Sequence, residues 1–169
     1  MPVPSAGQIT RTAATDHITT HLRTAIITGN LAPGEKVTIG AVAAATGFSP
    51  TPVGMALQAL TKAGLLTGGY NTTLTVATVT PNEAADAVEA LQMLAAAART
   101  TPNGADQFLT ALRHVRAGNP NAFRTAHRHA MELADLCQNQ VFADLIRDGL
   151  DGMLYRAQFT TTTGKDTNR

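Results

Sequence analysis

Polar side chains recur at helical spacing in a segment before the middle of the chain. Thr51, Gln58 and Lys62 are separated by seven and four residues, which places them on one face of a helix. A hydroxyl, an amide and an ammonium group on one face can contact phosphate oxygens and base edges. The segment is therefore a candidate nucleic-acid contact, and its position depends on the elements around it.

The segment from Gly47 to Leu66 predicts a complete helix. We expect Ser49 to accept a hydrogen bond from an amide of the first turn, and Pro52 lies where a missing N–H costs little. Gly64 supplies a left-handed residue that ends the helix. The outer face carries Gly54 and Met55 together with the polar side chains of Thr51, Gln58 and Lys62. The residues predicted to be buried are Val53, Ala56, Leu57 and Leu60.

Two helices are predicted before this one. Apolar residues at helical spacing predict a helix over residues 7–28, and a Pro33-Gly34 turn occupies residues 31–37. Thr38 is expected to cap a short helix over residues 39–46. The positions expected to face inward are Ile9, Ala13, Ile18, Leu22, Ile26, Val42 and Ala45. Two short helices joined by a glycine-containing turn predict a helix-turn-helix.

After Gly64 the apolar pattern changes to alternation. Residues 65–67 and 74–79 are predicted strands of a β-hairpin, with a turn at residues 68–71. The tip of this hairpin carries Tyr70, Asn71 and Thr72. Three helices followed by a hairpin predict a winged helix-turn-helix domain over residues 7–80.

The remainder of the chain is predicted to be helical, which makes the fold class mainly α. Thr80-Pro81 marks a domain boundary, and residues 81–158 are expected to form a short bundle for dimerisation or effector binding. Gly149 argues against a continuous last helix, and residues 159–169 are expected to be a mobile polar tail. The predicted helices cover residues 81–99, 105–116, 119–138 and 140–158.

Composition and charge narrow the functional class. Of the 169 residues, 44% are hydrophobic but only 4% are aromatic, which is typical of a thin core between closely packed helices. Residues 1–80 carry four basic and two acidic side chains, so this half has the positive sign expected of a nucleic-acid-binding domain. The single cysteine, Cys137, and the lack of a signal-like or membrane-spanning segment predict a cytoplasmic protein.

No catalytic or metal-binding constellation is recognisable. His17 and His21 lie one helical turn apart but lack a third ligand nearby, so a solvated helix face is the preferred interpretation. No paired carboxylates, nucleophile–base pair or phosphate loop is present, because Gly68-Gly69 lies in a hairpin and does not begin a helix. The sequence predicts no enzyme activity, no metal and no cofactor.

Two segments carry a family resemblance. Residues 21–35 contain Leu-Arg-Thr-Ala-Ile-Ile-Thr-Gly-Asn-Leu-Ala-Pro-Gly, and residues 47–66 contain Gly-Phe-Ser-Pro-Thr-Pro-Val, Ala-Leu and Gly-Leu-Leu in order. This pattern resembles the DNA-binding domain of GntR-family transcription regulators over about residues 10–80. From Pro81 onward the chain resembles, more weakly, the helical effector domain of the FadR-like subgroup, shortened at its end.

The resemblance implies a homodimer that binds a two-fold symmetric operator on double-stranded DNA. The helix after Gly47 would enter the major groove, and the hairpin would contact the neighbouring minor groove or backbone. It also implies a ligand-responsive C-terminal domain, whose effector the sequence does not identify. The residues expected to contact DNA are Arg11, Ser49, Pro50, Thr51, Gly54, Gln58, Lys62, Tyr70, Asn71 and Thr72.

The chain departs from the family pattern where DNA readout is expected. Family members usually carry arginines at the positions that hold Gly40, Pro50 and Gly54 here. Arginine reads guanine and neutralises phosphate, so its loss predicts weak or atypical base readout with a shallow salt dependence. An alternative hypothesis is a degenerate member that acts through protein partners, for example by pairing with a relative.

The C-terminal half also departs from the pattern. Leu91 and Ala95 stand where the subgroup usually has an arginine and an acidic residue, and the chain ends before the helices that supply further metal-binding histidines. The pair His127 and His129 points to different sides of a helix. A metal-and-carboxylate pocket is therefore not expected, and His114, His127 and His129 are interpreted as surface or interface residues.

Overall fold

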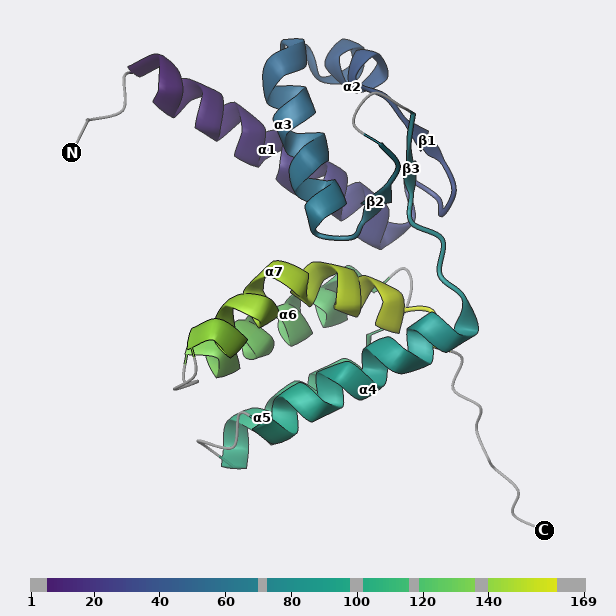
Figure 1. Ribbon diagram of the computed structural model, residues 1–169, viewed down its shortest axis with the longest axis vertical. Helices are drawn as coiled ribbons and strands as arrows, with labels where there is room; N and C mark the ends of the chain where they lie inside the picture. The colour runs from purple at the N-terminus through teal and green to yellow at the C-terminus, as the bar shows by residue number, and fades with distance from the viewer. Residues whose placement is uncertain (1–5, 70–72, 98–101, 116–118, 136–139, 161–169) are drawn as a thin grey trace.

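The computed structural model has an N-terminal winged helix-turn-helix followed by a helical C-terminal region (Figure 1). It describes residues 6–69, 73–97, 102–115, 119–135 and 140–160. Seven helices and three short strands lie within these ranges. They are α1 (Ala6–Thr28), β1 (Lys36–Val37), α2 (Ile39–Thr46), α3 (Pro50–Lys62), β2 (Leu66–Thr67), β3 (Leu74–Val76), α4 (Pro81–Ala97), α5 (Pro102–Arg113), α6 (Pro120–Asp135) and α7 (Gln140–Ala157). The mainly helical fold class and the winged N-terminal domain are confirmed.

Helices α1, α2 and α3 form the N-terminal core. Helix α3 packs against α1 and α2, and Figure 1 shows it crossing α1 with α2 beside its upper end. Thr38 caps α2 by accepting a hydrogen bond from the Ala41 amide at 3.2 Å, and Gly47 ends it with φ +73°. Ala13 and Ala45, predicted to face inward, are exposed. An alanine methyl is small enough that leaving it in water costs little, so apolar spacing alone does not fix its side.

The two ends of α3 differ in how far they follow the prediction. Ser49 is the N-cap residue, but its side chain makes no capping hydrogen bond, so the expected contact was wrong. Pro50 occupies the first helical position, where its missing N–H leaves no partner unsatisfied. Gly64 has φ +73°, and the Leu65 amide donates to the Leu60 carbonyl at 3.0 Å. This left-handed stop is the predicted one.

The sheet is antiparallel with strand order β1-β3-β2. Lys36 pairs with Thr75, and Leu66 pairs with Val76. Strand β1 lies in the segment predicted to be only a turn, and β3 ends at Val76 instead of residue 79. A two-residue strand leaves no alternation to detect, and its pairing partner is distant in sequence.

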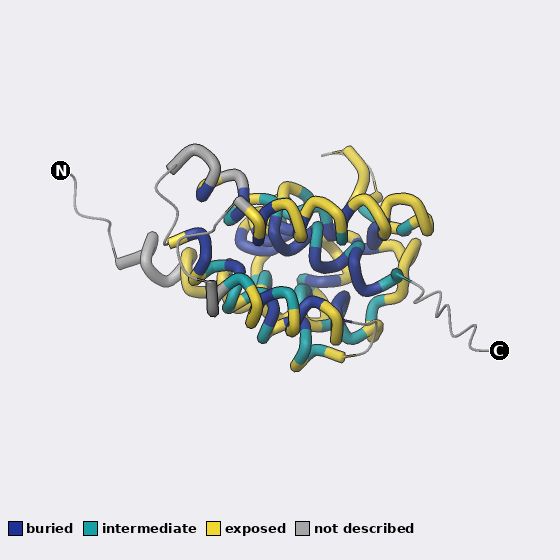
Figure 2. Tube along the Cα trace, turned by 90° about the horizontal axis from the view of Figure 1, so that it is seen from below, coloured by how far each residue is buried: buried dark blue, intermediate teal, exposed yellow. Residues whose placement is uncertain are grey.

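Helices α4 to α7 form the C-terminal region, in which α6 packs between α5 and α7 and α4 packs on α7. Thr80 and Glu83 form a reciprocal cap at the start of α4, and hydrogen bonds from Thr80 lower the pKa of Glu83. Helix α7 continues through Gly149, so the helix predicted over residues 140–158 is uninterrupted. Figure 2 shows that buried and exposed residues alternate along the helices, with the buried ones mostly toward the interior.

The buried core is continuous between the N-terminal domain and the helical region. It contains Leu57 and Leu60 of α3 together with Leu150 and Tyr155 of α7. Phe159 also packs against this core, with its ring edge-on to Tyr155 at 5.3 Å. The packing therefore includes Phe159, which the sequence had placed at the start of the polar tail.

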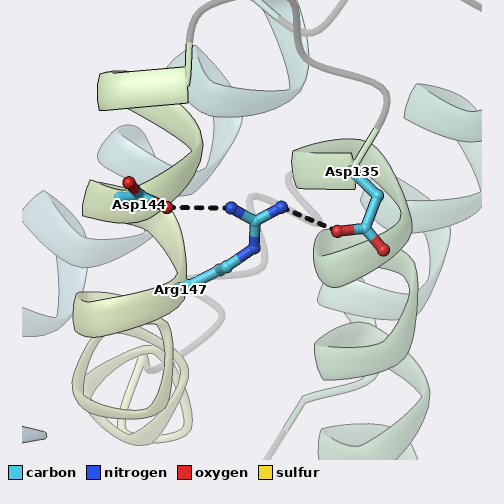
Figure 3. A network of polar contacts seen from close by, with 3 residues as sticks. All are labelled: Asp135, Asp144 and Arg147. Atoms are coloured by element: carbon cyan, nitrogen blue, oxygen red, sulfur yellow. Dashed lines mark hydrogen bonds and ion pairs between the residues drawn. The ribbon is translucent and has the colours of Figure 1, made fainter. Parts of the chain in front are cut away.

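Arg147 connects α6 and α7. Its guanidinium binds Asp135 of α6 at 2.7 Å and Asp144 of α7 at 2.9 Å, as Figure 3 shows. These carboxylates raise the pKa of Arg147. All three side chains reach solvent, so the contacts orient the two helices more than they stabilise the fold.

Candidate nucleic-acid interface

The outer face of α3 lies open to solvent. Thr51, Met55 and Gln58 are exposed, and Gly54 is partly exposed between them. Met55 retains 50% of its accessible surface, which is unusual for a large apolar side chain. The buried residues of α3 are Pro52, Val53, Ala56, Leu57 and Leu60. The predicted division of this helix into an inner and an outer face is confirmed.

The three positions that lack the usual arginines are open. Gly40 and Pro50 are exposed, and a Cβ built on Gly40 would meet no other atom within 4 Å. A Cβ on Gly54 would touch only the Ile39 Cδ1 atom, at 3.6 Å, which is an ordinary contact. Longer side chains at these positions therefore have room, and their absence does not result from crowding.

Few cations are available on this domain. Within the described N-terminal side chains, residues 12–69 and 73–80, the basic residues are Arg23, Lys36 and Lys62. Arg23 and Lys62 form ion pairs with Asp151 and Asp148 of α7. Lys36 is the only basic side chain in this described part for which no ion pair is seen. Phosphate neutralisation by the domain is correspondingly limited.

Four of the predicted contact residues have no described side chain. Arg11 belongs to α1, but its side chain lies outside the described part. Tyr70, Asn71 and Thr72, at the predicted hairpin tip, also lie outside the described residues. The structure brings together Ser49, Pro50, Thr51, Gly54 and Gln58 along the N-terminal two-thirds of α3, whereas Lys62 lies at its C-terminal end.

The C-terminal end of α3 rests on α7. Lys62 Nζ lies 3.0 Å from Asp148 Oδ2, and the two side chains keep 74% and 66% of their exposure. The Arg156 guanidinium lies beside Gly64, where a built Cβ would be 3.2 Å from its Nη1 atom. The Tyr155 hydroxyl donates to the Ala77 carbonyl at 2.9 Å, just after β3. Helix α7 therefore fixes the position of α3 and the sheet.

A buried carboxylate forms the centre of this junction. Asp151 Oδ2 lies 2.8 Å from Arg23 Nε of α1, and Asp151 Oδ1 lies 3.4 Å from His127 Nε2 of α6. The Asp151 side chain keeps only 11% of its exposure. One carboxylate thus connects three helices. The sequence analysis missed Asp148 and Asp151, although their three-residue spacing on a helix that also has an apolar face indicates a second contact surface.

Acidification is expected to weaken this junction through His127. Burial lowers the pKa of His127, and nearby Arg23 lowers it further, against the attraction of Asp151. A histidine with a lowered pKa binds its proton more readily in the unfolded chain. The stability it contributes is therefore present above the ordinary pKa near 6.5 and declines as the pH falls toward the folded value.

The measurement is the free energy of unfolding at pH 7.5 and at pH 5.5 for the wild type and His127→Gln. The wild type is expected to lose more stability on acidification than the variant. His21→Gln, at an exposed histidine of α1, is the matched control substitution. An equal loss in the wild type and His127→Gln would contradict the assignment.

Neither His17 nor the positions that depart from the subgroup pattern form a metal or ligand site among the described residues. His17 is exposed and its ring contacts Phe48, with centroids 6.0 Å apart. Leu91 and Ala95 are fully buried in the apolar core. Within the side chains that the structure describes, no group of three or more His, Cys, Asp or Glu residues is arranged to hold a metal ion. Nor does any described helix have the length and apolar character needed to cross a membrane.

The comparisons with known proteins agree with this architecture. The family described as bacterial regulatory proteins, gntR family, matches residues 14–68. No curated protein sequence matches the chain significantly.

Two solved structures are similar over most of the chain. A protein described as a transcriptional regulator GntR from Rhodococcus sp. RHA1 has a TM-score of 0.57 and 22% identity, covering 86% of this chain and 73% of its own. The E. coli protein McbR/YncC has a TM-score of 0.53 and 17% identity, covering 86% of this chain and 74% of its own. At these identities the likeness shows the fold. Residues 14–68 thus match the helix-turn-helix domain of the gntR family, and a helical C-terminal region follows them.

Proposed function

We propose that the protein is a transcription regulator that binds double-stranded DNA weakly, as a homodimer on a two-fold symmetric operator. The observation that carries the proposal is the exposed outer face of α3, uncharged over residues 50–61, on a winged helix-turn-helix frame. In this proposal Ser49, Pro50, Thr51, Gly54 and Gln58 contact the major groove. Hydroxyl and amide groups of this kind position a helix on phosphates and read base edges with modest strength.

The remaining predicted contacts complete the proposed surface. Arg11 would add a cation from α1, and Tyr70, Asn71 and Thr72 would contact the minor groove or backbone from the hairpin tip. Lys62 would have to leave Asp148 to reach a phosphate, which costs little because the pair is exposed.

The C-terminal helices are proposed to form the dimer contact and a shortened FadR-like effector domain. Met93 on α4 supports a contact between subunits, because this large apolar side chain keeps 62% of its exposure. In a dimer, the two copies of α3 would need to lie about 34 Å apart to enter successive major grooves. The proposed organisation keeps residues 7–80 for DNA and residues 81–158 for the subunit contact and effector. We place the protein in the cytoplasm on this proposal.

An electrophoretic mobility shift tests the proposal directly. The probe is the DNA upstream of the protein's own gene, at low salt, with an unrelated duplex of equal length as control. Retardation of the upstream DNA at lower protein concentration than the unrelated duplex would support operator binding. No retardation of either duplex at micromolar protein would overturn it.

Restoring an arginine to α3 is expected to strengthen DNA binding. The Gly54→Arg side chain has room beside Ile39 and adds a cation to the outer face. It should tighten binding to any duplex and steepen the salt dependence by about one phosphate contact per subunit. It should also stabilise the helix by about 1 kcal/mol, because glycine is unfavourable inside helices.

The matched control is Ala90→Arg, which adds the same charge to an exposed position of α4. Fluorescence anisotropy with one labelled duplex at several salt concentrations compares the two variants. Equal affinity gains for both would mean that net charge alone acts and that Gly54 does not face DNA.

A second function is favoured by the ion pairs of α7. Because Asp148 and Asp151 hold Lys62 and Arg23, the domain offers few cations to DNA. The alternative is a degenerate regulator that acts by pairing with a relative. It predicts no DNA shift by the protein alone and formation of a mixed dimer, which native mass spectrometry of the two purified proteins would detect.

A further inference from the structure

A groove of about 490 Å³ lies between the outer face of α3 and the sheet. The first turn of α2 forms one side, α3 forms the floor, and the segments around β2 and β3 form the other side. Figure 1 shows these elements meeting at the upper part of the molecule. This volume falls in the range of about 300–1,000 Å³ that is typical of small-molecule sites.

The walls of the groove are largely apolar. Val37 and Leu57 are buried beneath it, and Ile39 and Leu74 form its sides. Ile39 keeps 42% of its exposure, so its side chain presents apolar surface to whatever occupies the groove. Apolar surface of this kind gains free energy when a ligand covers it.

The polar groups of the groove are few and uncharged. The exposed Gln58 amide can both donate and accept a hydrogen bond, and the Thr73 hydroxyl is exposed at the opposite side. Thr38 also lines the groove, and its oxygen already accepts from the Ala41 amide. No charged side chain is among the described residues that line it. This lining suits a neutral ligand and leaves an ionised group without a partner.

Two glycines keep the groove open. Gly54 on α3 lacks a side chain where most of the neighbouring outer-face residues have one, and only Ile39 Cδ1 lies near its Cβ position. Gly68 has φ +131°, and a Cβ there would come within 3.0 Å of the Thr73 carbonyl. A larger residue at position 54 would fill the space that a ligand needs.

We propose that this groove binds an uncharged, largely apolar small molecule that carries one carbonyl or hydroxyl group. The apolar part lies against Ile39, Leu57 and Leu74, and the polar group is held by Gln58. Because Gly54 and Gln58 also belong to the face proposed to contact DNA, the bound ligand excludes DNA from α3. Only this competition rests on the proposed function; the ligand site itself does not.

Prodan, an uncharged naphthalene ketone with polarity-dependent fluorescence, serves as the probe. Titration of the full chain without DNA should give saturable emission that shifts to shorter wavelength. Gly54→Leu should weaken binding at least about tenfold, since leucine occupies the groove. This variant has a better helix former in α3, so it is expected to stay folded.

Gly40→Leu is the matched control, because it makes the same change at an exposed helical glycine with open space around it. Its prodan affinity should stay within about twofold of the wild type. In a two-dimensional amide spectrum, the Gly54 and Gly68 signals should move on prodan addition, and the Gly40 signal should not. Unsaturable binding, equal weakening by both variants, or unmoved Gly54 and Gly68 signals would each overturn the site.

Competition is measured last, with prodan added to the DNA complex. Loss of the wild-type mobility shift over the same prodan concentrations that saturate the fluorescence supports the exclusion of DNA. If the protein binds no DNA, the proposed function fails while the fluorescence and amide results still decide the ligand site.

Discussion

Replacing Asp151 by alanine is expected to lower the free energy of unfolding by about 3 kcal/mol. The carboxylate is buried and lies 2.8 Å from Arg23 and 3.4 Å from His127. Its removal leaves a partly buried guanidinium without its counter-charge and opens a space between α1, α6 and α7. Removing one partner of a buried ion pair costs about 3–5 kcal/mol, and the partial exposure of Arg23 places the expectation at the lower limit.

Asp148→Ala is the control for this prediction, since it makes the same change one helical turn away. Asp148 also pairs with a cation, Lys62, but both side chains are mostly exposed. Exposed pairs contribute about 0–1 kcal/mol, so the control should lose less than about 1 kcal/mol. Equilibrium denaturation in urea measures both. Similar losses in the two variants would contradict the view that the carboxylate at position 151 holds the junction.

Gly152→Ala is expected to destabilise the fold by about 2 kcal/mol. A Cβ at this position would overlap the carbonyl oxygen of Ala63 at the end of α3 and would come within 2.9 Å of Arg156 Nη1. The Ala63 carbonyl is backbone, so relief requires moving α3 away from α7. Overpacking of this kind costs about 1–3 kcal/mol and outweighs the helix propensity gained by removing a glycine.

Gly149→Ala gives the matched comparison on the same helix. A Cβ there would meet only the flexible Met153 Cε atom at 3.5 Å, an ordinary contact. This variant should therefore be more stable than the wild type, by up to about 1 kcal/mol. Thermal unfolding of both variants checks the pair. A stability gain in Gly152→Ala as well would mean that α3 and α7 are not in close contact.

The sequence predicted those elements that are determined by residues close together in the chain. Thr38, Gly47 and Gly64 begin or end helices through contacts within a few residues, and the structure places all three as expected. The inner face of α3 was equally predictable, because Val53, Leu57 and the residues between them repeat at helical spacing.

The remaining features depend on partners that are distant in the chain. Strand β1 forms only because Lys36 and Val37 pair with Thr75 and Leu74. Lys62 was predicted to contact DNA from its place on α3, and its ion pair with Asp148 joins residues 86 positions apart. Such contacts leave no periodic signal in the sequence.

The sequence predicted the position and the ends of α3, but it did not predict the groove beside this helix. The turn before α3, the cap position and the glycine at its end identified α3 as the helix whose outer face is available for contact with DNA. The groove beside it arises because Gly54, Ile39 and Leu74 from three separate elements meet in space. Whether a glycine in a helix opens a groove or merely weakens the helix depends on those neighbours, which the sequence pattern does not specify.

The measurement that tests the central proposal most directly is the affinity of the wild-type protein for its upstream DNA across a series of salt concentrations. Fluorescence anisotropy of a labelled duplex gives this affinity. We predict that the protein binds this DNA at low salt. The logarithm of the association constant should fall with the logarithm of the salt concentration with a slope shallower than about −5 for the dimer, because few cations contact the phosphates. No binding at micromolar protein and low salt, or a slope near −10, would contradict a regulator that contacts DNA through the exposed, largely uncharged face of α3.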